Sequence, residues 1–84
     1  MIPITLYGTP ICRRYQRMRE MVINASQRLG VPIELQEIGD TESLSQIDPL
    51  SLPRLYISDR LVASQNPPRV QEVELALGES LTNQ

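Results

Sequence analysis

Apolar and polar residues alternate at the start of the chain, with Ile2, Ile4 and Leu6 at the apolar positions. This period of two predicts a short strand, which the turn sequence Gly8-Thr9-Pro10 ends. The apolar side chains then recur at helical spacing: they are Tyr15, Met18, Val22, Ala25 and Leu29. The stripe predicts an amphipathic helix over residues 12–29, with Gly30 as its C-terminal stop.

The middle of the chain alternates again. Ile33 and Leu35 lie between polar neighbours, which predicts a second strand that ends near Gly39-Asp40. Residues 41–47 favour two helical turns, with Asp40 or Thr41 as the cap. Two short apolar runs flank Ser58-Asp59-Arg60 and predict a hairpin.

The last segment carries a helix-start signal. Asn66 is suited to the N-cap, and the following Pro67-Pro68 supplies a proline for the first helical position. The expected buried stripe is Val70, Val73, Leu77 and Leu81. We expect residues 78–84 to be frayed.

The order of these elements predicts an α/β fold. A strand–helix–strand unit requires a right-handed parallel crossover, and a following hairpin extends the sheet in the antiparallel sense. We therefore expect one domain over residues 1–84, with an ordered core of about residues 3–77. It should contain a four-stranded mixed sheet with helices on both faces. The first strand is expected to be central, so a reactive group belongs at its C-terminal end.

Composition narrows the function classes. The 84 residues are 40% apolar and 21% charged, as in ordinary globular proteins. No apolar run approaches the roughly 20 residues that span a bilayer, and the N-terminus lacks the pattern of a secretory leader. A lone cysteine forms no internal disulfide, which fits a reducing compartment. We expect a cytoplasmic protein that does not bind membranes.

The residue types that are missing exclude further classes. Without histidine, a Ser-His or Cys-His catalytic pair cannot form, and the commonest zinc ligand is absent, so no metal site is expected. Without Phe or Trp, and with a net charge of −2, the chain lacks both stacking platforms and a general attraction to phosphate backbones. We expect no nucleic-acid partner.

Cys12 is the candidate reactive residue, because it falls where a strand, a turn and a helix start meet. A helix N-terminus and the neighbouring Arg13 and Arg14 favour a thiolate. The alternative is a small buried hydrophobe, the usual role of a free cysteine. The nearby arginines, including Arg17 and Arg19, either hold an anion or are solvated surface charges.

Three stretches together resemble the thioredoxin fold in its compact, glutaredoxin-like form, over roughly residues 3–77. They are I-T-L-Y-G-T-P-I-C, S-L-P-R-L-Y-I and D-R-L-V-A-S-Q-N-P-P-R-V. The resemblance implies that Cys12 is the nucleophile and that Pro53, preceded by Leu52, is cis and faces it. The residues expected to line the substrate are Thr9, Pro10, Tyr15, Leu52 and Pro53.

The chain departs from the family pattern at three places. Tyr15 stands where the resolving cysteine of the dithiol is expected, and its most direct role is as the first residue of the buried stripe. Thr9 stands where the family often has a lysine that grips glutathione. Residues 63–66 lack the small-residue pair and acidic residue that hold the rest of that tripeptide.

The resemblance implies a single-cysteine thiol–disulfide redox protein, an oxidoreductase of monothiol type if it is an enzyme. Cys12 would form a mixed disulfide with a protein disulfide or with glutathione, and an external thiol would resolve it. No cofactor is expected. Glutathione is the one candidate if the chain does bind one. We expect a monomer, with a Cys12-linked dimer on oxidation.

Two alternatives stay open. The first is a redox-inert module of the same fold that binds a protein partner through the same face. The second is an iron–sulfur carrier, in which two Cys12 thiolates and two glutathiones share one cluster in a dimer.

Overall fold

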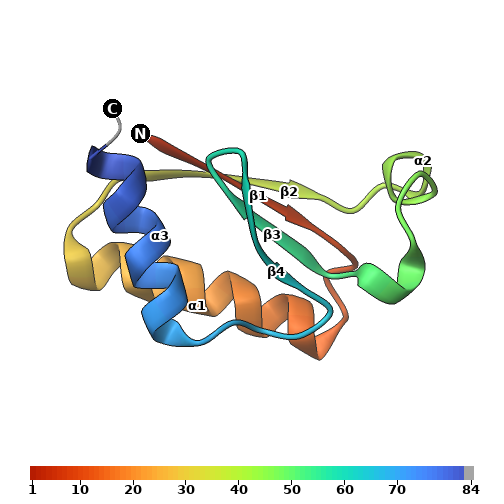
Figure 1. Cartoon of the computed structure of the whole chain (residues 1–84). Coiled ribbons are helices and arrows are strands. Elements are labelled where there is room, and N and C mark those ends of the chain that lie inside the picture. Colours follow the sequence, from red (N-terminus) through yellow and green to blue (C-terminus); the bar gives the residue numbers. More distant parts are fainter. Residues whose placement is uncertain (83–84) are drawn as a thin grey trace.

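The computed structural model, which describes residues 1–82, is built on one four-stranded sheet with the strand order β2-β1-β3-β4 (Figure 1). The strands are β1 (Ile2–Tyr7), β2 (Ile33–Ile38), β3 (Arg54–Ile57) and β4 (Arg60–Ser64). β1 pairs in parallel with β2 and antiparallel with β3, which forms the hairpin with β4. The predicted α/β class, the mixed sheet and the central first strand are confirmed.

One face of the sheet carries the core. Side chains at alternate strand positions are buried there: Ile2, Ile4, Leu6, Leu55 and Ile57. Helices α1 (Arg13–Leu29) and α3 (Val70–Thr82) add Met18, Val22, Val73 and Leu77 to the same cluster, and they contact each other. None of the helices in residues 1–82 is long and apolar enough to cross a membrane.

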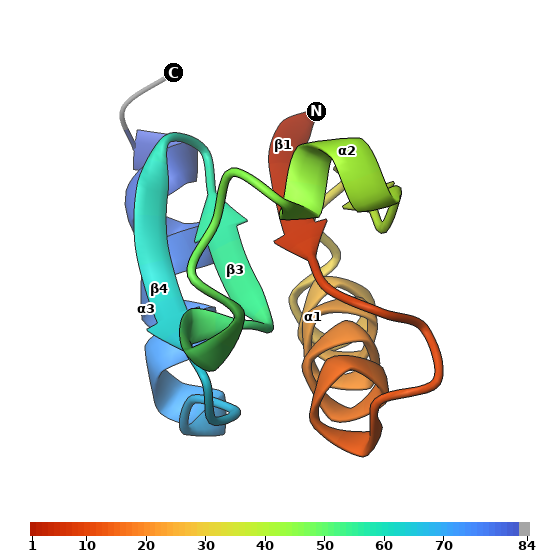
Figure 2. The same ribbon diagram turned by 90° about the vertical axis from the view of Figure 1, so that its right-hand side faces the viewer.

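The expectation of helices on both faces needs correction. The two long helices share one face (Figure 2), and only the short helix α2 (Thr41–Leu44) lies elsewhere, beyond the C-terminal end of β2 (Figure 1). None of its residues is buried, and a 3-10 turn (Pro49–Ser51) leads on to β3. Asp40 caps α2 as expected, since its side chain accepts from the Ser43 N–H, but one turn forms where two were expected. Such a short helix cannot cover a sheet face.

Helix α1 follows its sequence signals closely. Cys12 is the N-cap and Gly30, with a φ of 66°, ends the helix in the left-handed conformation that glycine adopts readily. The predicted stripe is buried except at its last position, where Leu29 is exposed. Met21, which the stripe omitted, is also buried, and it lies beside the start of α3.

Helix α3 begins later and ends later than the sequence pattern predicts. Asn66 is not its N-cap: the helix starts at Val70, because a proline disfavours the helical conformation of the residue before it and Pro67 precedes Pro68. The helix continues through Thr82, so the expected fraying is wrong for residues 78–82. Residues 83–84 of that expected tail lie outside the described residues.

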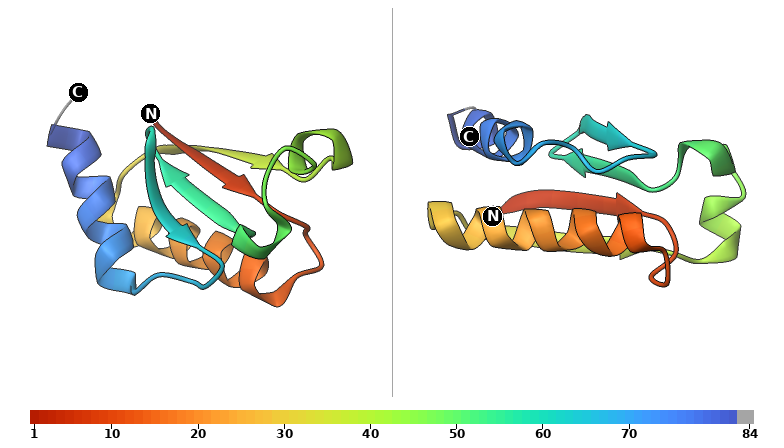
Figure 3. Two further views of the ribbon diagram at one scale, coloured as in Figure 1. Left: turned by 45° about the vertical axis from the view of Figure 1, so that its right-hand side comes forward. Right: turned by 90° about the horizontal axis from the view of Figure 1, so that it is seen from below.

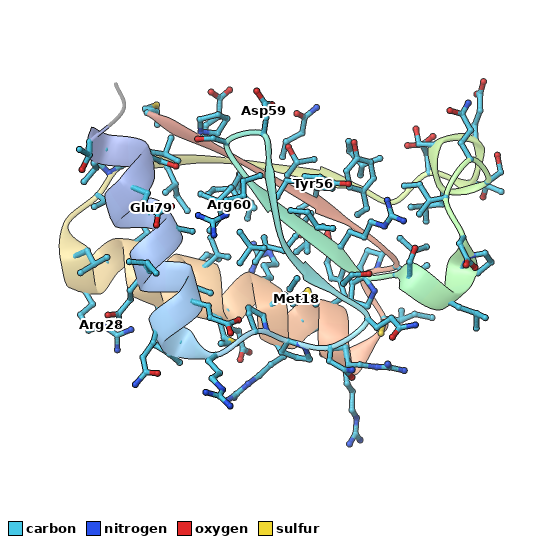
Figure 4. All side chains as sticks on the ribbon, viewed as in Figure 1. Met18, Arg28, Tyr56, Asp59, Arg60 and Glu79 are labelled. Carbon is cyan, nitrogen blue, oxygen red and sulfur yellow. The ribbon has the colours of Figure 1, made fainter. Side chains whose placement is uncertain are left out.

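The expected stripe of α3 is also only half right. Val73 and Leu77 are buried, together with Ala76, whereas Val70 and Leu81 at the two ends are exposed. Contacts with the hairpin instead hold the last turns: Ser58 Oγ lies 3.0 Å from Ser80 Oγ. Arg60 and Glu79 form a salt bridge beside them (Figure 4).

Candidate functional site

Cys12 lies at the end of the molecule where β1 gives way to α1. It is half-buried, packs against the core, and leaves part of its side chain accessible. Its backbone N–H donates to the carbonyl of Thr9 at 3.0 Å, and its own carbonyl accepts from the Gln16 N–H at 3.0 Å. The turn and the helix therefore fix the Cys12 backbone from both sides.

Gly8 is the point at which three segments of the site meet. Its φ is 151°, and its N–H donates to the carbonyl of Ile38 at 3.1 Å. A Cβ at this position would lie 2.8 Å from Cδ2 of Tyr15 and 3.1 Å from Cβ of Pro53. Only glycine fits this close approach, which brings the start of α1 and the start of β3 together.

Pro53, before β3, and Gln65, after β4, are hydrogen-bonded to each other at this end of the sheet. The Leu52–Pro53 peptide bond is cis, in agreement with the resemblance. The Pro53 carbonyl accepts from the N–H of Gln65 at 3.0 Å, and the Gln65 carbonyl accepts from Nη1 of Arg14 at 3.3 Å. The Gln65 side chain donates to the carbonyl of Leu50. Gln65 thus ties together α1, the 3-10 turn and the start of β3.

Sequence analysis missed Gln65. Its φ is 72°, a left-handed conformation that is uncommon for a residue other than glycine, and it persists only where surrounding contacts hold it. The sequence Ser-Gln-Asn-Pro-Pro indicates a turn in that region but gives no sign of which residue adopts this conformation.

Tyr15 serves the core rather than the surface of the site. Its side chain is 2% exposed, and its hydroxyl donates to Oε1 of Glu37 on β2 at 2.7 Å. Nε of Arg19 donates to the same oxygen at 3.1 Å. Burial, and then the Glu37 carboxylate, raises the pKa of Tyr15 well above that of an exposed tyrosine.

The residues expected to line a substrate fall into two groups by the exposure of their side chains. Thr9 and Pro10 are exposed beside Cys12 and Leu52 is half-buried, whereas Pro53 is buried. Tyr15 is buried as well, and its hydroxyl is bound to Glu37 rather than directed at the Cys12 sulfur. It forms a structural anchor between α1 and β2, so its expected contact with substrate is wrong.

Six of the eight arginines fall into two sets. Arg19, Arg28 and Arg60 form salt bridges, with Glu37, Glu74 and Glu79 respectively. The expected anion-binding residues Arg13, Arg14 and Arg17 are exposed and, within residues 1–82, form no salt bridge. The set that forms no salt bridge in the described chain begins directly after Cys12.

Two exposed apolar side chains complete the surroundings of the site. Ile11, next to Cys12 in the turn, is 88% exposed, and Leu50, whose carbonyl binds Gln65, is 75% exposed. Sequence analysis missed both. The position of Ile11 between Pro10 and the helix start was the available signal, because a turn at a helix N-terminus seldom buries its side chains.

No protein-family model matches this chain, and no curated protein is similar enough to count as a match. Within residues 1–82, no three potential ligands from histidine, cysteine, aspartate and glutamate lie close enough together to hold a metal ion.

Proposed function

We propose that this chain is a single-cysteine, glutaredoxin-like thiol–disulfide redox protein of the thioredoxin fold, acting through a mixed disulfide at Cys12. One observation carries the proposal. Cys12 is a partly accessible thiol at the N-cap of a 17-residue helix, where the segments of Gly8, Pro53 and Gln65 converge. The sheet order β2-β1-β3-β4, with both long helices on one face, supports the thioredoxin-like resemblance.

The chemistry requires one sulfur from the protein. The Cys12 thiolate attacks one sulfur of a substrate disulfide, the new Cys12 S–S bond forms, and the substrate S–S bond breaks. The departing thiolate takes a proton from solvent, which replaces the proton that Cys12 lost. The attacking sulfur belongs to the N-cap residue of α1, and the two residues that follow it, Arg13 and Arg14, are both exposed.

The second step has to come from outside the chain. Tyr15 occupies the place of a resolving cysteine, and its hydroxyl is both buried and bound to Glu37. An external thiol, for which glutathione is a candidate, attacks the mixed disulfide and releases the Cys12 thiolate. The protein then acts as a monothiol oxidoreductase in a reducing compartment such as the cytoplasm.

The test compares one thiol in two states of the same chain. The rate constant for exchange between Cys12 and hydroxyethyl disulfide is measured at neutral pH for the folded protein and for the protein unfolded in urea. Because the cysteine is the same, the ratio reports what the fold does to it. We expect the folded protein to react at least about ten-fold faster, in line with the rates of activated thiols. The Cys12→Ser variant should show no exchange.

A folded rate equal to or below the unfolded rate would refute the redox proposal. It would favour the redox-inert binding module. A buried Tyr15 and a partly buried Cys12 are both compatible with that alternative. The iron–sulfur alternative is tested separately, by the absorbance of protein purified without oxygen in the presence of glutathione.

A further inference from the structure

The arginines are divided between the two ends of the contact between α1 and α3. At the end far from Cys12, Nη2 of Arg28 lies 2.5 Å from Oε1 of Glu74, so the charge of α1 is matched by one on α3 (Figure 4). At the end near Cys12, Arg14 and Arg17 of α1 face the segment that precedes α3 and, within residues 1–82, have no carboxylate in salt-bridge range.

This end of the contact is open. A depression of about 540 Å³ lies between α1 and the first turn of α3, lined by Arg17, Met21, Pro67, Pro68, Arg69, Val70 and Gln71. The segment that follows β4 runs along α1 before it enters α3 (Figure 3). Two arginines, Arg17 and Arg69, therefore line this depression together with apolar residues. We call Arg14, Arg17 and Arg69 the basic seam.

The acidic residues near the basic seam form no salt bridge with it in the described chain. The carboxylate of Glu72, in the first turn of α3, accepts from the backbone N–H of Arg69 at 3.4 Å rather than from the guanidinium. Glu20, one turn beyond Arg17, forms no salt bridge in the described chain. Arginine presents a planar fork that suits carboxylates, so a partner can supply the groups that are missing here.

The surroundings favour a protein segment as that partner. Ile11, next to Cys12 in the chain, and Leu50, whose carbonyl binds Gln65, are both largely exposed and offer apolar contacts that a small anion would not use. The whole chain carries a net charge of −2, which opposes a long polyanion such as a nucleic acid but permits a short acidic segment at a local basic site.

We infer that the basic seam selects the substrate: Cys12 acts on a disulfide flanked by an acidic, partly apolar segment of another protein, whose carboxylates bind Arg14, Arg17 and Arg69. This inference rests on the proposed function, since it names the substrate class. The binding step does not need the thiol, so it can be tested apart from the chemistry.

The first experiment measures binding with the full-length Cys12→Ser protein. The probe is a fluorescent peptide in which glutamate and leucine alternate around one serine, and its counterpart has glutamine in place of glutamate. We expect the acidic peptide to bind at least about five-fold more tightly at low salt, with a preference that shrinks as ionic strength rises. Substituting Arg17→Gln and Arg69→Gln together should reduce the preference to less than about two-fold.

The matched control changes two arginines at the far end, Arg28→Gln and Arg60→Gln, and removes the same charge. The preference should survive in the control. Equal binding of the two peptides, an equal loss in the control, or tighter binding of a single-stranded oligonucleotide would each overturn the inference.

The second experiment separates this inference from the proposed function. The same peptides, with cysteine in place of serine and activated as a mixed disulfide with 2-thiopyridine, react with wild-type protein. The Cys12–peptide S–S bond forms and pyridine-2-thione leaves. Faster exchange with the acidic peptide supports both ideas. Exchange at equal rates refutes only the acidic preference, whereas acidic binding without exchange refutes only the redox function.

Discussion

The hydroxyl of Tyr15 offers the sharpest test of how the site is built. The substitution Tyr15→Phe keeps the buried ring against Gly8 and removes only the group that donates to Glu37 at 2.7 Å. A cost in stability then reports on the hydroxyl alone, because no cavity is created.

The size of the stability loss follows from the two groups of this hydrogen bond, the Tyr15 hydroxyl and the Glu37 carboxylate. A hydrogen bond to a charged group contributes about 1.5–3 kcal/mol, and the low end applies when the partner can recover water. The Glu37 side chain is 40% exposed and keeps its contact with Arg19, so its carboxylate is not left unsatisfied. We expect a loss of about 1–2 kcal/mol in the free energy of unfolding, or about 5–12 °C in Tm for a domain of this size.

The pH dependence gives a second and independent readout. Burial raises the pKa of Tyr15 in the folded state, whereas a tyrosine in the unfolded chain ionises near pH 10. Above about pH 10 the folded state keeps a proton that the unfolded state has lost. The contribution of Tyr15 to the free energy of unfolding is therefore complete below that pH and is lost as pH rises toward the folded-state pKa. The free energy of unfolding falls in this range by no more than about 1.4 kcal/mol per pH unit.

The composition makes this alkaline range unusually easy to interpret. All eight basic residues are arginine, so no lysine titrates there. The other tyrosines and Cys12 are present in both proteins and cancel in the difference. We expect the stability gap between wild type and Tyr15→Phe to narrow by about 1 kcal/mol between about pH 8 and pH 11.

Urea denaturation followed by circular dichroism at several pH values provides the assay. The control is Tyr56→Phe, because the Tyr56 hydroxyl is only half-buried and accepts a long contact of 3.4 Å from Arg54. It should cost less than about 0.5 kcal/mol. If Tyr15→Phe behaves like Tyr56→Phe, or if its gap to wild type is constant with pH, the anchor between α1 and β2 is not as described.

Two further predictions concern the same junction. Gly8→Ala places a Cβ within 2.8 Å of Tyr15 and within 3.1 Å of Pro53, so it should cost more than about 2 kcal/mol in thermal unfolding. Gly78→Ala, which meets nothing within 4 Å in helix α3, should instead gain about 0.5–1 kcal/mol, and equal effects at the two sites would contradict the packing around Gly8. Tyr15→Cys should close a reversible disulfide with Cys12 under mild oxidant, as judged by thiol labelling, since the two positions lie one helical turn apart. The lost ring should cost about 3–5 kcal/mol, so folding is checked first, and a folded variant that never closes the bond would count against Cys12 and Tyr15 as the two dithiol positions.

The sequence predicts those parts of the fold in which local signals and burial agree. Helix α1 has both a regular apolar stripe and a glycine stop, and β1 has a clean alternation, so their positions were predicted closely. Helix α3 was misplaced, because the helix-start signal at Asn66 competes with the conformational limit that Pro68 imposes on Pro67.

The candidate site was predictable only in its local part. Cys12 at a helix start follows from neighbouring residues, and the sequence shows it. The bond from Tyr15 to Glu37 and the bond from Arg14 to Gln65 join residues separated by 22 and 51 positions. Their existence depends on strand register and loop course, which no local pattern specifies.

The role of Tyr15 also explains how a site with one sulfur stabilises the fold. A cysteine at that position would leave a cavity beside Gly8. It would also remove the hydroxyl that binds Glu37, which would keep its contact with Arg19. The chain instead uses the position to bind α1 to β2, and it thereby gives up internal resolution of a mixed disulfide. Selectivity must then come from whatever positions the incoming substrate beside Cys12. The arginines that follow Cys12 are exposed and form no salt bridge within residues 1–82, so a second protein can reach them. The buried Tyr15 cannot contribute to such a contact.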